Sequence, residues 1–375
     1  MTSLDSHRPF TGWGAWRIGP IWPVTEFADT LSADLLWDQL NLLAKVPKKG
    51  LALYSCVESE QATRWQGLND FVRQAKSYHD ALSVTPGTAR ALLGYYSALN
   101  LAKAELLHSA PDSVLDVKIH HGLSFDVASA TSLEEDRVKV LKDGVFPLLF
   151  EARTGLSIPN GTTLSVRELL ARVPELTHEY YQYFDERPPT VRAWVAMVMD
   201  ESHYWLDVLL NAKSDAIMAT PEWSGFDAAF KEVALAPGYK SFFVGAPYRP
   251  ADLCMFEQRN ARRMRAGGVI PAALFGDLKD CLGASINNAF EWAHGFDFVP
   301  SMSLGIQLPM PSFLARYAIM FYLSSLVRYR PSRLNPDRVP LDSWIMESFA
   351  RQSPVRLLAD AYDGISRQTS RYEYR

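Results

Sequence analysis

An apolar segment with proline at both ends sets the strongest limit on how this chain folds. Residues 312–330 read SFLARYAIMFYLSSLVRYR, and Pro311 and Pro331 stand directly before and after them. Proline is tolerated at a helix start and disfavours helix in the residue before it, so the segment predicts one helix over Ser312–Arg330. We expect its apolar face to pack on helices from earlier in the chain, giving one extended core.

Two charged residues in this helix argue against a membrane span. Arg316 and Arg328 interrupt the apolar stretch Phe313–Tyr329, which is also short for a crossing. We therefore expect no membrane association. A buried arginine needs an anionic partner or an anionic ligand, which makes Arg316 a candidate ligand-binding residue.

The rest of the chain predicts a mainly α fold with minor β structure. Arg90–His108 is the clearest helix, because it is rich in Ala and Leu. Apolar spacing predicts further helices at Trp65–Leu82 and Ser165–Tyr183. Short β-like or irregular pieces are expected around Val145–Phe150, and Val191–Leu210 is either helical or partly strand.

Composition shifts along the 375 residues predict three regions. Residues 1–59 form an N-terminal tryptophan-rich segment, and residues 60–187 form a helical region. Pro188 and Pro189 mark a boundary, after which residues 188–375 form a mostly helical C-terminal region packed on the second. We assign no role to the tail at residues 353–375.

Composition also narrows the compartment and the class of partner. The three cysteines lie far apart and form no CxxC pair, which favours a reducing cytoplasm. The N-terminus has no basic stretch followed by an apolar run, so it does not resemble a secretory signal. The net charge of −4 gives no strong positive field of the kind that attracts nucleic acid to a whole surface.

The common catalytic and cofactor motifs are missing from the sequence. It contains no GxxxxGK[ST] loop, no strand-linked GxGxxG, no HExxH and no GxSxG. We expect no cofactor and assign no metal site. Asp200 and His203 could share a helix face and hold a metal, but a hydrogen-bonded stripe between apolar faces explains them equally simply.

Two histidines and an arginine are the candidate catalytic residues. Arg73 and His79 stand six residues apart, and an Arg–His pair can cut RNA without metal: histidine takes the 2′-hydroxyl proton and arginine stabilises the phosphorane. Six helical steps place them about 120° apart, so a regular helix does not put them on one face. His121 is a third candidate, or a structural histidine that caps the turn before Gly122.

A basic and aromatic cluster lies at the end of the late helix. Arg328, Tyr329 and Arg330 can bind phosphate and stack on a base. The alternative is a helix end whose cations complement the macrodipole.

Three stretches together resemble the YaaC-like protein family. They are Arg90–Ala104 (RALLGYYSALNLAKA), His121–Phe125 (HGLSF) and Phe321–Pro331 (FYLSSLVRYRP). The first stretch adds Tyr95, Tyr96 and Lys103 to the candidate ligand-binding set.

The helix with Tyr95 and Tyr96, followed by HGL, also resembles helical bundles of the HEPN superfamily, which occur in toxins and antiviral systems. That resemblance implies a HEPN-like helical bundle within residues 60–187 and a homo-oligomer. Many members are metal-independent RNases, whereas inactive members act as binding or interaction modules.

Our first functional hypothesis is a non-enzymatic nucleotide- or RNA-binding component of a bacterial stress or phage-defence system. It would act as a homo-oligomer or with a partner protein of the same operon. The alternatives are a metal-independent HEPN-type endoribonuclease and a structural adaptor protein.

Overall fold

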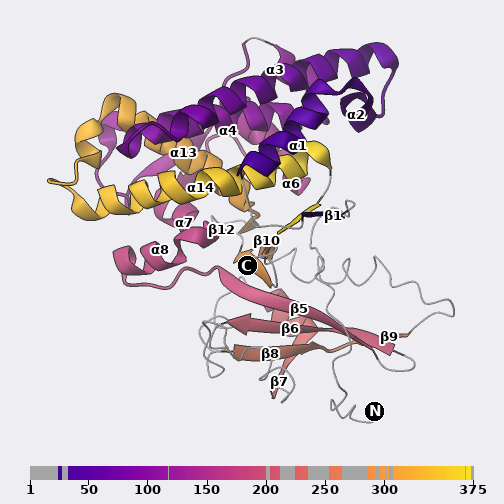
Figure 1. Cartoon of the computed structure of the whole chain (residues 1–375). Coiled ribbons are helices and arrows are strands. Elements are labelled where there is room, and N and C mark those ends of the chain that lie inside the picture. Colours follow the sequence, from indigo (N-terminus) through magenta and orange to yellow (C-terminus); the bar gives the residue numbers. More distant parts are fainter. Residues whose placement is uncertain are drawn as a thin grey trace. The chain divides into compact units, whose positions relative to one another are not determined.

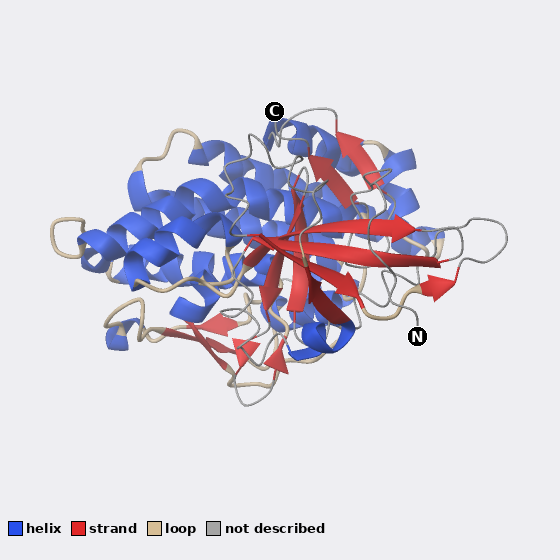
Figure 2. Cartoon of the chain, turned by 90° about the horizontal axis from the view of Figure 1, so that it is seen from below, coloured by secondary structure: helices blue, strands red, loops and turns tan. Residues whose placement is uncertain are grey.

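The computed structural model describes residues 24–27, 33–116, 118–199, 203–211, 224–234, 253–263, 286–292, 295–300, 302–303, 307–367 and 369–372. The chain divides into two compact units. The helical unit comprises Trp22–Pro188 and Met310–Arg375, and the sheet unit comprises Met1–Ile21 and Pro189–Pro309. Figure 1 labels their elements, and Figure 2 distinguishes helices from strands by colour.

The helical unit contains long helices, short connecting helices and short strands. Its α-helices are α1 (Ala33–Lys45), α2 (Pro47–Gly50), α3 (Glu58–Leu82), α4 (Arg90–Leu106), α5 (Pro111–Leu115), α6 (Val145–Thr154), α7 (Val166–Leu170), α8 (Thr177–Phe184), α13 (Ser312–Tyr329) and α14 (Pro340–Ser366). Its 3₁₀ helices are η1 (Leu51–Leu53), η2 (Gly87–Ala89), η3 (Val127–Ser129), η4 (Pro174–Leu176) and η7 (Pro331–Leu334). Its strands are β1 (Val24–Phe27), β2 (Leu123–Ser124), β3 (Arg137–Val140), β4 (Thr163–Ser165) and β14 (Thr369–Tyr372).

Helix α13 forms the core of this unit. Every residue from Ser312 to Leu326 is buried, as expected for a helix that is apolar on all sides. Helices α4 and α14 both pack against it. The approach of α4 depends on Gly94, because a Cβ atom there would lie 3.2 Å from the sulfur of Met320.

Two small sheets complete the helical unit. Strands β2, β3 and β4 form an antiparallel sheet in which Leu123 pairs with Val140 and Val138 with Leu164. Along β3 the valines are buried and the intervening basic residues are exposed, which is the alternation of a half-buried strand. Strands β1 and β14 pair in parallel and join the two ends of the described chain.

A buried ion cluster holds α13 to its neighbours. Arg316 is 1% exposed. Its Nε and Nη2 donate to the two carboxylate oxygens of Glu175 at 2.8 and 2.7 Å, and its Nη1 donates to Asp360 at 2.6 Å. Ser353 donates a further hydrogen bond to Glu175. Burial raises the pKa of Glu175, but the charge of Arg316 and these hydrogen bonds outweigh burial, so the pKa lies below its ordinary value.

Several predicted elements of the helical unit can be compared with the structure. The helices expected at Arg90–His108 and Ser312–Arg330 are confirmed as α4 and α13. The single helix expected at Ser165–Tyr183 is wrong: Pro174 interrupts the pattern, and the segment forms α7, η4 and α8. The β-like piece expected around Val145–Phe150 is instead the start of α6, which follows Gly144.

The sheet unit contains the larger sheet. Its strands are β5 (Val191–Met199), β6 (His203–Asn211), β7 (Phe230–Val233), β8 (Leu253–Gln258), β9 (Arg262–Arg263), β10 (Ile286–Trp292) and β11 (Gly295–Pro300). They are antiparallel in the order β10-β11-β5-β6-β8-β7, with β9 on β6. A short helix, α10 (Ser224–Ala229), precedes β7, and β12 (Met302–Ser303) pairs with β13 (Gln307–Leu308).

The β-branched start of Val191–Leu210 left helix and partial strand open, and the segment forms the hairpin β5–β6. The prediction of a mainly α chain with minor β structure is confirmed, since helices hold most of the residues in regular structure in the described part of the chain. The boundary between the helical unit and the sheet unit falls between Pro188 and Pro189, next to the predicted boundary. They then separate the region 188–375: residues 189–309 carry the large sheet, whereas residues 310–375 belong to the helical unit.

Replacing Arg316 with methionine should destabilise the helical unit by about 3–5 kcal/mol, because two buried carboxylates lose their cation. Urea unfolding followed by far-UV circular dichroism measures this change. The matched control is Arg73→Met, whose exposed pair with Asp70 is worth less than about 1 kcal/mol. Equal unfolding midpoints for the two variants would contradict the assignment.

Candidate functional site

The three stretches that resemble the YaaC-like family meet at one place in the helical unit. Tyr95 comes from α4, His121 from the loop before β2, and Phe321 from α13. The Phe321 ring centre lies 4.6 Å from that of His121 and 5.9 Å from that of Tyr95. Tyr95 and His121 are themselves 6.4 Å apart, edge to face. Segments separated by more than 200 residues therefore form one aromatic cluster.

The backbone around His121 is fixed by two glycines. Gly122 and Gly144 both have positive φ, and a Cβ on Gly144 would lie 2.6 Å from the Cα of Gly122. This contact lets the first amides of α6 reach the loop: Val145 N–H donates to the His120 carbonyl and Phe146 N–H to the His121 carbonyl, at 2.9 and 3.0 Å. The loop is thus held by the N-terminus of a helix.

Hydrogen bonding also sets the tautomer of His121. The N–H of Leu123 donates to its Nδ1 at 3.2 Å, so the proton of the neutral ring is on Nε2. Burial, with the nearby His120 and the charge of Arg328, lowers the pKa of His121 to about 4. At neutral pH this side chain is therefore an uncharged hydrogen-bond donor at Nε2.

Arg328 supplies a positive charge beside this donor. It lies two helical turns after Phe321, on the same face of α13, and its charge acts on both Tyr95 and His121. Its Nε donates to the Ser324 carbonyl at 3.1 Å, and its guanidinium lies 5.1 Å from the centre of the Tyr329 ring. Within the described part of the chain no carboxylate pairs with it.

Tyr95 completes the group. Its side chain is buried, which raises its pKa, so the hydroxyl stays protonated and can donate. No other described residue hydrogen-bonds to that hydroxyl. We call Tyr95, His121 and Arg328 the anion site, because each offers a hydrogen-bond donor and none is a carboxylate.

The other predicted ligand-binding residues have surroundings of their own. Tyr329 is 65% exposed at the end of α13, and Arg330 donates to the Ala128 carbonyl at 2.7 Å. Tyr96 faces α3, where its ring stacks on Tyr78 at 5.3 Å. Lys103 also faces α3: its amine lies 5.8 Å from the Phe71 ring centre, and burial lowers its pKa.

Arg316 stands apart from the anion site. Its expected anionic partner proves to be two carboxylates of the chain itself, Glu175 and Asp360. These contacts account for its burial without a ligand.

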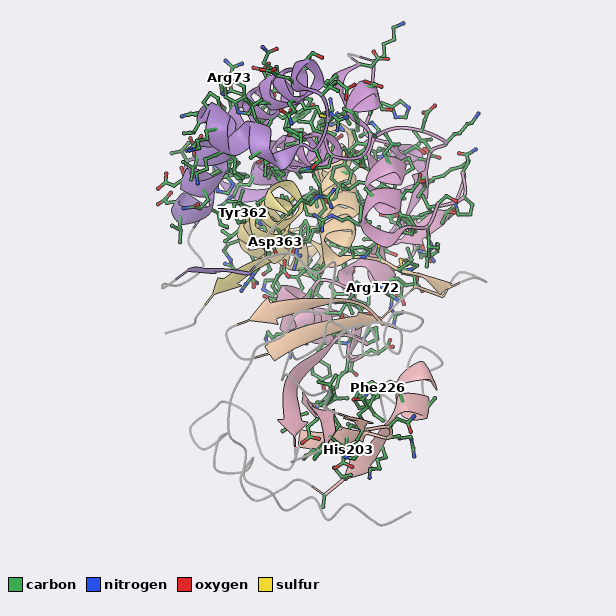
Figure 3. All side chains as sticks on the ribbon, turned by 90° about the vertical axis from the view of Figure 1, so that its right-hand side faces the viewer. Arg73, Arg172, His203, Phe226, Tyr362 and Asp363 are labelled. Atoms are coloured by element: carbon green, nitrogen blue, oxygen red, sulfur yellow. The ribbon has the colours of Figure 1, made fainter. Side chains whose placement is uncertain are left out.

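The structure does not bring the three candidate catalytic residues together. Arg73 is on the exposed surface of α3, where it pairs with Asp70 at 2.7 Å (Figure 3). His79 packs against Trp37 of α1 with ring centres 5.2 Å apart, and burial lowers its pKa. His121 instead packs on α13. Of the metal candidates, His203 is on strand β6, and Asp200 lies outside the described residues.

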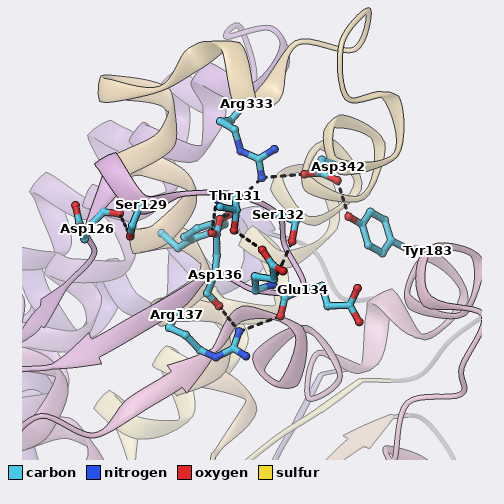
Figure 4. Close-up of polar contacts among 12 residues, drawn as sticks. Asp126, Ser129, Thr131, Ser132, Glu134, Asp136, Arg137, Tyr183, Arg333 and Asp342 are labelled. Atoms are coloured by element: carbon cyan, nitrogen blue, oxygen red, sulfur yellow. Dashed lines mark hydrogen bonds and ion pairs between the residues drawn. The ribbon is translucent and has the colours of Figure 1, made fainter.

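Sequence reasoning missed a polar network beside the anion site (Figure 4). Tyr322, the neighbour of Phe321, donates to Asp136 at 2.5 Å, and Arg333 donates to Asp342 at 3.2 Å. Tyr183 donates to the other oxygen of Asp342. Tyr322, Arg333 and Tyr183 lie in or near stretches that the sequence singled out, but Asp136 and Asp342 do not, so periodicity offered no signal for the carboxylates.

Comparison with known proteins supports the family resemblance. Residues 47–223 match the family model described as YaaC-like Protein, which is less than half of the chain. The match includes Arg90–Ala104 and His121–Phe125, and Phe321–Pro331 lies beyond it. No curated protein and no solved structure matches the chain.

The described residues also bear on membrane insertion and metal binding. None of the helices they form has the length and apolar character to cross a membrane. In the same residues, no group of three His, Cys, Asp or Glu side chains is arranged to hold a metal ion.

Replacing Gly122 with alanine should lower the free energy of unfolding by more than the strain of a positive φ costs by itself. A Cβ there would lie 2.5 Å from Pro147 Cδ and 2.9 Å from the Phe146 nitrogen. Gly155→Ala is the matched control, because Gly155 also has positive φ but no atom within 4 Å of the added Cβ. We expect about 1–2 kcal/mol for the control and at least about 1 kcal/mol more for Gly122→Ala, measured by chemical unfolding. Equal losses would mean that the close contact has no energetic weight.

The His121 ring should remain neutral, with its proton on Nε2, until the pH falls to about 4. The unfolded chain takes up this proton near the ordinary pKa of 6.5, so this group lowers stability as the pH falls from 6.5 towards 4. Ring ¹⁵N chemical shifts, assigned with His121→Gln, follow the titration. Protonation near pH 6.5 in the folded protein would refute the assigned tautomer and burial.

Proposed function

We propose that the chain binds a nucleotide or RNA through the anion site of Tyr95, His121 and Arg328, without catalysing a reaction. The observation that carries the proposal is the exposed guanidinium of Arg328, which has no carboxylate partner in the described part of the chain and lies beside two further donors. A guanidinium with neutral donors around it suits phosphate, whose oxygens accept several hydrogen bonds at once.

The aromatic surroundings suit the rest of a nucleotide. Tyr329 is largely exposed and lies under the Arg328 guanidinium, so its ring offers a surface on which a base can stack. A cation and an exposed aromatic ring in adjacent positions are the two elements from which sequence-tolerant nucleic-acid sites are built.

The tautomer of His121 supports binding over catalysis. A base that removes the ribose 2′-hydroxyl proton needs an unprotonated nitrogen facing the substrate. The Nδ1 of His121 is occupied by the Leu123 N–H, and Nε2 already carries a proton. Arg73 pairs with Asp70 on the surface, whereas His79 packs against Trp37. Because the two side chains have different partners, this arrangement also supports binding over catalysis.

The biological setting and the assembly are part of the proposal. The resemblance to HEPN-like bundles suggests a component of a bacterial stress or phage-defence system that acts as a homo-oligomer or with a partner protein of the same operon. An interaction module without catalysis fits that role.

Arg328→Ala should weaken binding of a single-stranded RNA oligonucleotide at least about tenfold, because the phosphate loses its charged donor. Fluorescence anisotropy at fixed ionic strength measures the affinity. Arg73→Ala, which removes an exposed arginine elsewhere on the helical unit, is the control and should bind as the wild type does.

Unchanged affinity in Arg328→Ala, or no binding by the wild type, would overturn the proposal; co-purification of a partner protein without any RNA binding would then favour the adaptor. The recovered oligonucleotide also tests catalysis. RNA that stays intact in EDTA agrees with binding alone, whereas cleavage that His79→Ala abolishes would favour the nuclease.

A further inference from the structure

A separate cavity lies between the loop after β2 and strand β3. Its volume is about 290 Å³, at the lower end of ligand-pocket volumes and therefore suited to a small group such as a single base. It is lined by Ser124, Phe125, Asp126, Ser129, Glu135, Asp136, Arg137 and Lys139. We call it the β2–β3 pocket.

The β2–β3 pocket and the anion site are close to each other along the chain. Ser124 follows His121 by three residues, and the bend at Gly122, whose φ is positive, keeps their Cα atoms closer than the roughly 10 Å of a fully extended segment. Arg330 is near both the anion site and the pocket. It follows Arg328 by two residues, and it donates to the carbonyl of Ala128, which lies in the loop that lines the pocket.

The faces of α13 give the same placement. Phe321 and Arg328 lie on the face that meets His121, whereas Tyr322 and Tyr329 lie on the next face. Tyr322 contacts the pocket directly: its ring packs on Phe125 at 4.8 Å, and its hydroxyl donates to Asp136. A ligand with its phosphate at Arg328 can therefore extend past Tyr329 towards the pocket.

The pocket offers acceptors and two cations, of which Arg137 already donates to the Glu134 and Asp136 carbonyls. Asp126 uses one carboxylate oxygen to accept the Ala128 N–H, and Glu135 uses one to accept the Thr131 hydroxyl; the second oxygen of each has no hydrogen-bond partner among the residues that the structure describes. Lys139 has no carboxylate partner among the described residues. Asp136 is already occupied by Tyr322 and the Thr131 amide, so it belongs to the fold.

We infer that the β2–β3 pocket binds a guanine base whose phosphate is held at the anion site, an inference that rests on the proposed function. Guanine presents two neighbouring donors, N1–H and the 2-amino group, and carries the acceptors O6 and N7. The remaining oxygens of Asp126 and Glu135 can each accept from one of the two donors, and the Lys139 amine donates to the acceptors. Phe125 provides an apolar wall for the ring.

The test compares guanosine and inosine monophosphates, which differ only in the 2-amino group. Isothermal titration calorimetry on the full chain should give a dissociation constant for the guanine nucleotide at least about tenfold lower than for inosine. Glu135→Gln and Asp126→Asn are measured separately, and at least one of them should reduce this ratio to about one. Asparagine at 126 keeps an oxygen for the Ala128 amide, so the loop is preserved.

The control variant is Glu134→Gln, which removes the adjacent carboxylate that pairs with Arg167 and should leave the ratio unchanged. Equal affinities for the two nucleotides in the wild type, both lost in Arg328→Ala, would overturn the guanine inference and leave the phosphate site standing. An unchanged ratio in both pocket variants would also overturn it. If neither nucleotide nor single-stranded RNA binds, the proposed function fails first and the inference fails with it.

Discussion

The buried guanidinium of Arg316 is the interaction on which the helical unit depends. A cation inside an apolar helix is costly unless it is paired and hydrogen-bonded, and Glu175 and Asp360 together accept a hydrogen bond from each of the three guanidinium nitrogens. The two carboxylates come from η4 and α14. Because the bidentate contact with Glu175 requires a fixed orientation of the guanidinium, the cluster sets the rotation of α13 about its own axis as well as its position.

The rotation of α13 determines which elements its other faces contact. Successive residues turn by about 100°, so Phe321 lies about 140° from Arg316 on one side and Tyr322 about 120° on the other. One face carries the carboxylate cluster, the second meets α4 and the His121 loop, and the third meets β3 through Asp136. Two turns further on, Arg328 and Tyr329 continue the second and third faces beyond the core, where they are exposed.

The sequence predicted α13, α4 and the need for an anionic partner of Arg316, because each follows from residues that are neighbours along the chain. It did not identify Glu175. The apolar spacing of Ser165–Tyr183 is that of one helix, and only the break at Pro174 produces η4 and brings Glu175 to the core. Tyr95, His121 and Arg328 were each singled out, but their meeting depends on the packing of α4 and α13, and no local pattern contains that information.

The packing around His121 also determines which chemistry this side chain can perform. The sequence left two roles open, a catalytic acid or base and a structural residue before Gly122. The loop decides between them through its backbone: Gly122 and Gly144 permit the close approach, α6 fixes the carbonyls, and the Leu123 amide then occupies Nδ1. A ring that can only donate at Nε2 suits an anion that must be held, and it does not suit a hydroxyl that must lose its proton. The same residue in a loop without these constraints could do either.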